Sequence, residues 1–111
     1  MALIPMEYRG GWTQTTLSPQ TGDEAVNNYG TLYALKNDDL QLVELVWTGN
    51  GTAPVANSYY FVLPSAYIPK VQCLTPLRNG VMLEARAEGK ARVALSTDAW
   101  SGGTLTYVIA N

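Results

Sequence analysis

Acidic and aromatic side chains are the groups through which this sequence could act on a ligand. The 111 residues include nine Asp and Glu and no histidine. Hydrolysis of a glycosidic bond needs two carboxylates at a fixed separation, and most of the acids here fall in predicted turns or on exposed strand faces. Serine and cysteine nucleophiles usually need a histidine as their base. The sequence therefore predicts a protein that is not an enzyme.

Two further reactive groups have structural interpretations. Glu44 shares one face of a predicted strand with Leu42 and Val46, so we expect its carboxylate to be paired, at a sheet edge, or at a contact between subunits. Cys73 is the single cysteine, which excludes a disulfide within the chain. It lies in an alternating run and is interpreted as a buried or half-buried inert thiol.

No metal, cofactor, nucleic acid or membrane is predicted as a partner. The acidic pairs Asp23-Glu24 and Asp38-Asp39 lack the spaced oxygen ligands of a calcium loop, so turn formation is the preferred interpretation. The net charge is −2 and no basic run exceeds two residues, which gives no electrostatic footprint for nucleic acid. No apolar run approaches the roughly 18 residues that span a bilayer.

A saccharide contact is predicted in residues 96–103, a loop with the sequence STDAWSGG. An aromatic ring can stack on the C–H face of a sugar while a neighbouring carboxylate bonds its hydroxyls, and Trp100 with Asp98 offers this combination. The alternative is that Trp100 anchors its loop to the core. Tyr60 is a third candidate, because Tyr59 and Tyr60 point to opposite faces of a strand and one of them should be exposed.

An oligomer interface is predicted around Trp12, Arg9 and Glu44. Trp12 follows Arg9-Gly10-Gly11 near the start of the chain, and it could pack this segment onto a neighbouring subunit. Aromatic residues and arginine are enriched in the cores of interfaces. Trp47, in contrast, ends a predicted buried strand and is expected in the core.

Strands must position these residues, because helix signals are almost absent. Strand-like runs separated by turn residues recur roughly every ten residues, which predicts an all-β fold, an antiparallel β-sandwich or jelly-roll-like barrel of about seven or eight short strands. The expected strands cover 31–36, 40–47, 58–63, 71–77, 81–86, 91–95 and 104–109. The strand over 40–47 is mostly apolar on both faces, which predicts that both are covered. Residues 1–28 are expected to form an N-terminal arm and edge segment, and residues 29–111 the sandwich, within a single domain overall.

The hairpin after residue 81 allows a prediction of register. A two-residue loop would place the apolar faces of its strands on opposite sides. A three-residue loop over 87–89, with its glycine in the left-handed conformation, aligns them. It places Leu83 opposite Val93 and Glu84 opposite Arg92.

The order of these features from Tyr29 onward resembles that of a known protein family. The strand Tyr29–Lys36 is followed by a buried strand ending in Trp47-Thr48-Gly49 and then by the run Leu63-Pro64-Ser65-Ala66-Tyr67-Ile68-Pro69. A glycine-turned hairpin and a last strand complete the series. This order resembles the head domain of receptor-binding proteins from phage tails and baseplates, and the Leu63–Pro69 run is its most specific part.

The resemblance implies a β-sandwich head in a phage virion that binds host cell-surface saccharide, without catalysis, as a homotrimer. One departure is that receptor-binding proteins of this kind carry a shoulder and a neck before the head. Here residues 1–28 show no heptads and no Gly-x-y repeat. The alternative is therefore a structural virion subunit, such as a decoration or baseplate assembly protein, with a protein partner instead of a sugar.

Overall fold

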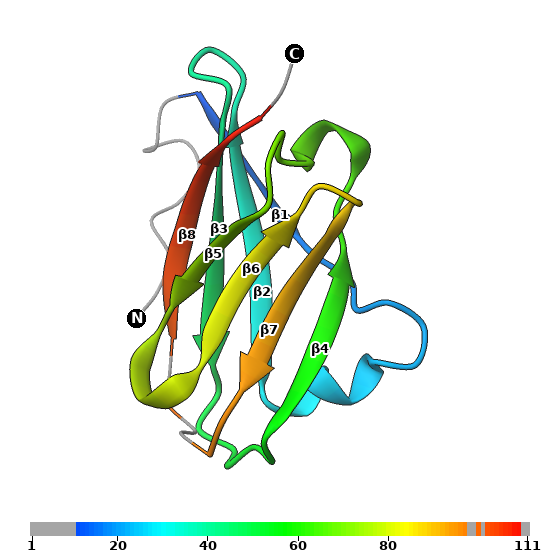
Figure 1. Cartoon of the computed structure of the whole chain (residues 1–111), viewed down its shortest axis with the longest axis vertical. Coiled ribbons are helices and arrows are strands. Elements are labelled where there is room, and N and C mark those ends of the chain that lie inside the picture. The colour runs from blue at the N-terminus through cyan, green and yellow to red at the C-terminus, as the bar shows by residue number, and fades with distance from the viewer. Residues whose placement is uncertain (1–10, 98–99, 101, 110–111) are drawn as a thin grey trace.

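Two antiparallel sheets of four strands each pack face to face in the part of the chain that the structure describes (Figure 1). The structure is a computed structural model, and the described residues are 11–97, 100 and 102–109. Sheet A contains, in spatial order, β1 (Trp12–Thr16), β2 (Gly30–Asn37), β3 (Leu42–Gly49) and β8 (Gly102–Val108). Sheet B contains β4 (Asn57–Val62), β7 (Lys90–Leu95), β6 (Met82–Arg86) and β5 (Cys73–Pro76). The predicted all-β sandwich is confirmed.

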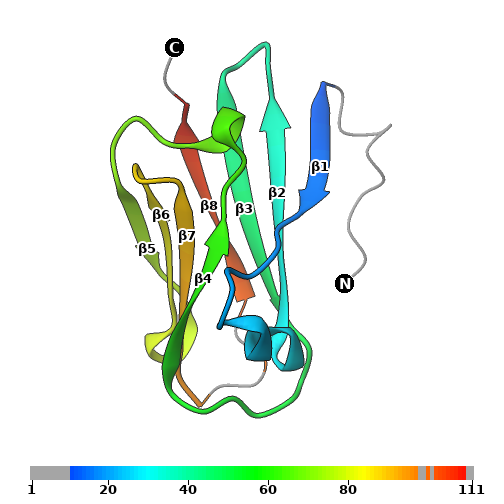
Figure 2. The same cartoon turned by 90° about the vertical axis from the view of Figure 1, so that its right-hand side faces the viewer.

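Short 3₁₀ turns and hairpins connect the strands. The turns are η2 (Glu24–Asn28), η3 (Ser65–Tyr67) and η4 (Arg78–Gly80). Hairpins join β5, β6 and β7, and a longer connection brings β4 beside β7, so sheet B is a Greek key. The chain passes from β3 to β4 and from β7 to β8 at one end of the sandwich, which is the lower end in Figure 1. Figure 2 shows the two layers from the side.

The core lies between the sheets and is built from alternate residues of each strand. On β3, Val43, Leu45 and Trp47 point inward and are buried, which confirms the prediction for Trp47. Its indole meets the ring of Phe61 edge-on, with 6.4 Å between ring centroids. Gly30 makes this fit possible. A Cβ added to Gly30 would lie 2.7 Å from Cζ2 of Trp47 and 2.3 Å from the carbonyl oxygen of Thr48.

The opposite face of β3 differs from the prediction. Leu42, Glu44 and Val46 point away from sheet B and are only half-buried. The prediction that both faces of this strand are covered therefore holds in full only for the inner face, although Leu35 beside Glu44 on the outer face is buried. The strand also begins two residues later than expected, because Gln41 adopts a left-handed backbone with φ of 54° that ends the turn.

The β6–β7 hairpin has the predicted register. Leu83 pairs with Val93, and Glu84 pairs with Arg92. The loop is residues 87–89, and Gly89 has a positive φ of 99°. Its amide donates a 3.0 Å hydrogen bond to the Arg86 carbonyl and closes the loop. Hydrophobic alternation on both strands was sufficient to fix this register, because a slip by one residue would turn every apolar side chain to solvent.

Residues 12–28 contribute a strand to sheet A, contacts along the edge of sheet B and two side chains to the core. β1 is an edge strand of sheet A, and Leu17 and Val26 are buried in the core. Between them, the chain runs along the edge of β4, where Ser18 accepts a hydrogen bond from the Val62 amide at 3.0 Å. The Asp23 carboxylate adds to this contact by accepting a bond of 2.8 Å from a β4 backbone amide.

The segment between Pro64 and Pro69 is irregular, as predicted, and one tyrosine ties it to sheet A. It contains the single turn η3. The Tyr107 hydroxyl, on β8, donates a 2.6 Å hydrogen bond to the carbonyl oxygen of Tyr67. Tyr107 is buried, and this burial raises the pKa of its hydroxyl well above the usual value.

Candidate functional site

Trp100 stands on the surface at the end of the sandwich where the chain passes between the sheets. It is 71% exposed, so the alternative in which it anchors its loop to the core is wrong. Its ring contacts Gly51 of the β3–β4 connection. An added Cβ on Gly51 would lie only 2.5 Å from Cη2 of the indole. The two connections between the sheets therefore meet at this ring.

The loop that supports Trp100 is held by hydrogen bonds. Gly51 has a positive φ of 88°, a conformation that favours glycine. The side-chain amide of Asn50 donates to the carbonyl oxygen of Asn28 at 3.0 Å, and its oxygen accepts from the Thr52 amide at 2.9 Å. The backbone amide of Asn50 donates to Tyr29 at 3.0 Å. These bonds fix the surface on which the indole lies before any ligand arrives.

This arrangement is suited to stacking and not to bond breaking. An indole with so much exposed surface presents a rigid apolar plane on which the C–H face of a sugar ring can rest. The exposed side chains of Asn28 and Thr52 lie by the same loop and can bond hydroxyl groups. We call Trp100 together with Gly51, Asn50, Asn28 and Thr52 the Trp100 platform.

Of the other two predicted saccharide residues, one cannot be placed relative to the platform and one lies elsewhere. Asp98 lies outside the described residues. Tyr60 points outward from β4 while Tyr59 is buried in the core, so the prediction that they occupy opposite faces is confirmed. The Tyr60 ring lies in mid-strand on sheet B, with the Lys90 ammonium 5.6 Å from its centroid and Arg92 opposite it on β7. It therefore belongs to a second surface.

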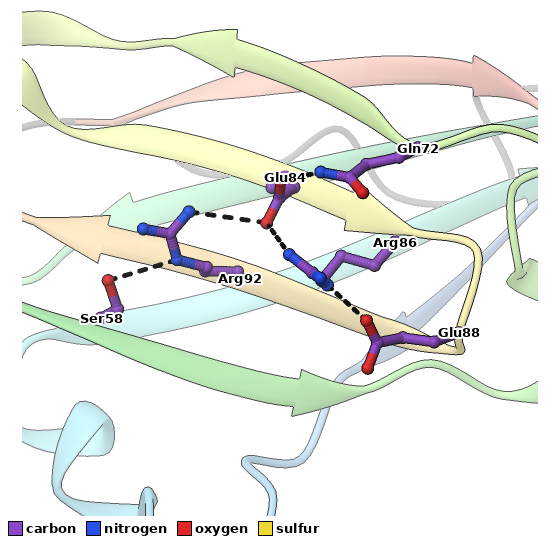
Figure 3. A network of polar contacts seen from close by, with 6 residues as sticks. All are labelled: Ser58, Gln72, Glu84, Arg86, Glu88 and Arg92. Atoms are coloured by element: carbon purple, nitrogen blue, oxygen red, sulfur yellow. Dashed lines mark hydrogen bonds and ion pairs between the residues drawn. The ribbon is translucent and has the colours of Figure 1, made fainter.

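That second surface contains a polar network that the sequence did not reveal in full (Figure 3). Glu84 points to the outer face of sheet B, yet only 4% of it is exposed. Its carboxylate accepts a hydrogen bond from Arg86 at 3.0 Å, lies 3.5 Å from Arg92, and also accepts a bond from Gln72. We call these residues, with Glu88 and Ser58, the Glu84 network.

The long side chains of the Glu84 network fold over the carboxylate and bury it. The Arg86 guanidinium also binds Glu88 at 2.7 Å. This hydrogen bond lowers the pKa of Glu88 and raises the pKa of Arg86. Two cations and an amide therefore surround the Glu84 carboxylate and compensate its burial. The expected Glu84–Arg92 pair is thus present, but the expectation of an exposed carboxylate is wrong.

Two of the three predicted interface residues lie on the outer face of sheet A. Trp12 on β1 and Glu44 on β3 both point away from sheet B and are half-buried. Leu42 and Val46 share this face. Arg9 lies outside the described residues. The structure thus brings Trp12 and Glu44 to one partly apolar surface.

The remaining sequence expectations concern metals, membranes and the thiol. Among the described residues, no group of three or more His, Cys, Asp or Glu could hold a metal ion. The described chain contains no helix with the length and apolar character that a bilayer span requires. Cys73 is half-buried, as predicted, and its Sγ donates to the Val71 carbonyl at 3.2 Å. Comparison of the chain with protein families, curated proteins and solved structures found no match.

Proposed function

We propose that this protein is a non-catalytic saccharide-binding module whose ligand stacks on the Trp100 platform. The observation that carries the proposal is a tryptophan that is 71% exposed and that rests on Gly51 of a hydrogen-bonded loop. A large aromatic side chain is an effective anchor for a ligand when its position is fixed in advance, because little conformational entropy is lost on binding.

The nature of the saccharide follows from the resemblance of residues 29–111 to phage receptor-binding heads. We propose a host cell-surface saccharide as the ligand and the phage virion as the location of the protein. The homotrimer that the resemblance implies is part of the same proposal. The β3–β4 connection that supports the platform lies at one end of the sandwich (Figure 1), and this end could face a cell surface.

Binding to a glycan array and to purified cell-wall polysaccharide tests this proposal. Trp100→Ala should weaken binding at least about tenfold, because removal of a central aromatic anchor typically costs about 2 kcal/mol or more of binding free energy. Trp100→Phe should keep part of the affinity. Leu40→Ala is the matched control, since Leu40 is also an exposed apolar residue but lies in the turn at the other end of the sandwich. Unchanged binding in Trp100→Ala would overturn the proposal.

A structural role in the virion is a second candidate, and the outer face of sheet A favours it. Trp12, Leu42 and Val46 make that face partly apolar, as a protein partner would require. Val46→Asp should then reduce incorporation of the protein into particles, while saccharide binding stays intact. Trp100→Ala should show the reverse pattern. The two variants together separate the two functions.

A further inference from the structure

The sequence contains two Asn-Gly pairs, Asn50-Gly51 and Asn79-Gly80. In such a pair, the backbone amide nitrogen of the glycine can attack the side-chain Cγ of the asparagine, because glycine has no Cβ to obstruct the approach. A new N–Cγ bond closes a five-membered succinimide ring, the Cγ–Nδ2 bond breaks, and ammonia leaves with the proton of the glycine amide. Water then opens the ring to aspartate or isoaspartate. Since this deamidation needs only water, the local structure decides which pair reacts first.

The surroundings of Asn50 favour this reaction. Asn50 is exposed in the β3–β4 connection, and its side-chain oxygen accepts a 2.9 Å hydrogen bond from the Thr52 amide. This donor polarises the carbonyl that is attacked, and it faces the oxygen on which negative charge develops, as in an oxyanion hole. Among the hydrogen bonds within the described residues, none uses the Gly51 amide as its donor, so this nitrogen is free to attack.

The backbone around Asn79 opposes the reaction. Asn79 lies inside the 3₁₀ turn η4, and the Val81 amide closes this turn with a 3.1 Å hydrogen bond to the Arg78 carbonyl. The succinimide ring fixes the ψ angle of the asparagine far from its helical value, so the turn must unwind before the ring can close. The two pairs have the same residue types, and the structure therefore predicts faster deamidation at Asn50 than at Asn79.

Both products of the reaction at Asn50 break contacts that support the Trp100 platform. The side-chain amide of Asn50 donates to the Asn28 carbonyl at 3.0 Å. Conversion to aspartate replaces this donor with a carboxylate oxygen, which can only accept, so two acceptor oxygens then face each other. Conversion to isoaspartate also lengthens the backbone before Gly51 by one carbon. Gly51 has little room to move, because an added Cβ there would lie 2.5 Å from the Trp100 indole.

We infer that Asn50-Gly51 is a site of spontaneous deamidation, and that this modification switches off saccharide binding at the Trp100 platform as the protein ages. The loss of binding rests on the proposed function, whereas the modification itself does not. No enzyme is required, so the age of each molecule determines its state.

Ageing of the purified chain at elevated temperature in mildly alkaline buffer tests the inference. Peptide mapping by mass spectrometry measures asparagine, aspartate and isoaspartate at positions 50 and 79, and binding to purified cell-wall polysaccharide is measured on the same samples. Asn50 should convert before Asn79, and binding should fall in proportion to the intact Asn50 that remains. The chain unfolded in urea is the reference, in which the two pairs should convert at similar rates.

Asn50→Asp separates the consequence from the reaction. This variant should bind saccharide at least about tenfold more weakly than the wild type, with a circular dichroism spectrum that shows that it is folded. Asn79→Gln is the matched control, which should bind normally when fresh and lose binding at the wild-type rate on ageing.

Two results would overturn the inference: conversion of Asn50 in the folded chain no faster than that of Asn79, or full binding by protein that is converted at Asn50. If the fresh wild type binds no saccharide, the proposed function fails instead, and the order of conversion still decides whether Asn50 is the reactive site.

Discussion

Replacement of Tyr107 by phenylalanine should destabilise the protein in a way that reverses at high pH. Tyr107 is 4% exposed, and its hydroxyl donates a 2.6 Å hydrogen bond to the Tyr67 carbonyl. Tyr107→Phe removes the hydroxyl, so the Tyr67 carbonyl oxygen loses this hydrogen-bond donor. A loss of this kind lowers the free energy of unfolding by about 1.5 kcal/mol. With an unfolding entropy of about 2.1 cal/mol/K per residue, the melting temperature of a chain of 111 residues should fall by about 6 °C at neutral pH.

The pH dependence follows from the burial of the hydroxyl, which raises its pKa in the folded state. In the unfolded chain, Tyr107 ionises with a pKa of about 10. Above that pH the unfolded state releases a proton that the folded state retains, so the wild type loses about 1.4 kcal/mol of stability per pH unit. The phenylalanine variant has no such loss at this position. The stability advantage of the wild type should therefore be complete below pH 10, vanish near about pH 11 and reverse above it.

Urea denaturation of both proteins at several pH values from about 7 to about 12 measures this difference and covers the range of the reversal. Other tyrosines and lysines titrate in both proteins, so their contributions cancel in the comparison. A difference that stays constant from neutral to alkaline pH would show that the hydroxyl is not held neutral by burial. Equal stability at pH 7 would show that the hydrogen bond to the Tyr67 carbonyl does not contribute.

Two further predictions concern the Trp100 platform and the Glu84 network. Gly51→Ala should weaken saccharide binding as strongly as Trp100→Ala, because the new Cβ would displace the indole. Gly22→Ala should bind normally in the same assay, because Gly22 also has a positive φ but an added Cβ there would have nothing within 4 Å. Glu84→Ala should lower the free energy of unfolding in urea by about 2 kcal/mol, less than for a fully buried pair because its two arginine partners are 29% and 27% exposed. Glu88→Gln should cause little change, since Glu88 is 52% exposed, and equal effects of these two substitutions would contradict the structural role of the network.

Local pattern was enough to predict the parts of the fold that depend on neighbouring residues. Alternation in the strands around Leu83 and Val93, with Gly89 in the loop, determined the register of the hairpin. Alternation also predicted that Tyr59 and Tyr60 point to opposite faces of their strand. β1 was harder to recognise, because its sequence WTQTT has few apolar residues and forms a strand by pairing with β2.

Contacts between distant segments were beyond the reach of the sequence. The stacking of Trp100 on Gly51 depends on how the two connections between the sheets meet in space, and no spacing in the chain encodes it. The burial of Glu84 depends on the direction that the long arginine and glutamine side chains take after the sheet has formed. The composition of the loop around Trp100 was the available signal for the platform. It indicated Trp100 as a candidate but not the Gly51 loop that supports the indole.

The strand order of sheet A has a consequence for synthesis on the ribosome. β3 lies between β2 and β8, but residues 50–101 separate the end of β3 from the start of β8. At the usual translation rates of about 5–20 residues per second, the apolar strand β3 waits several seconds for its second neighbour. During that time, its open edge is available to other nascent chains. The completion of sheet A is therefore the step at which chaperones should most affect the yield of this protein.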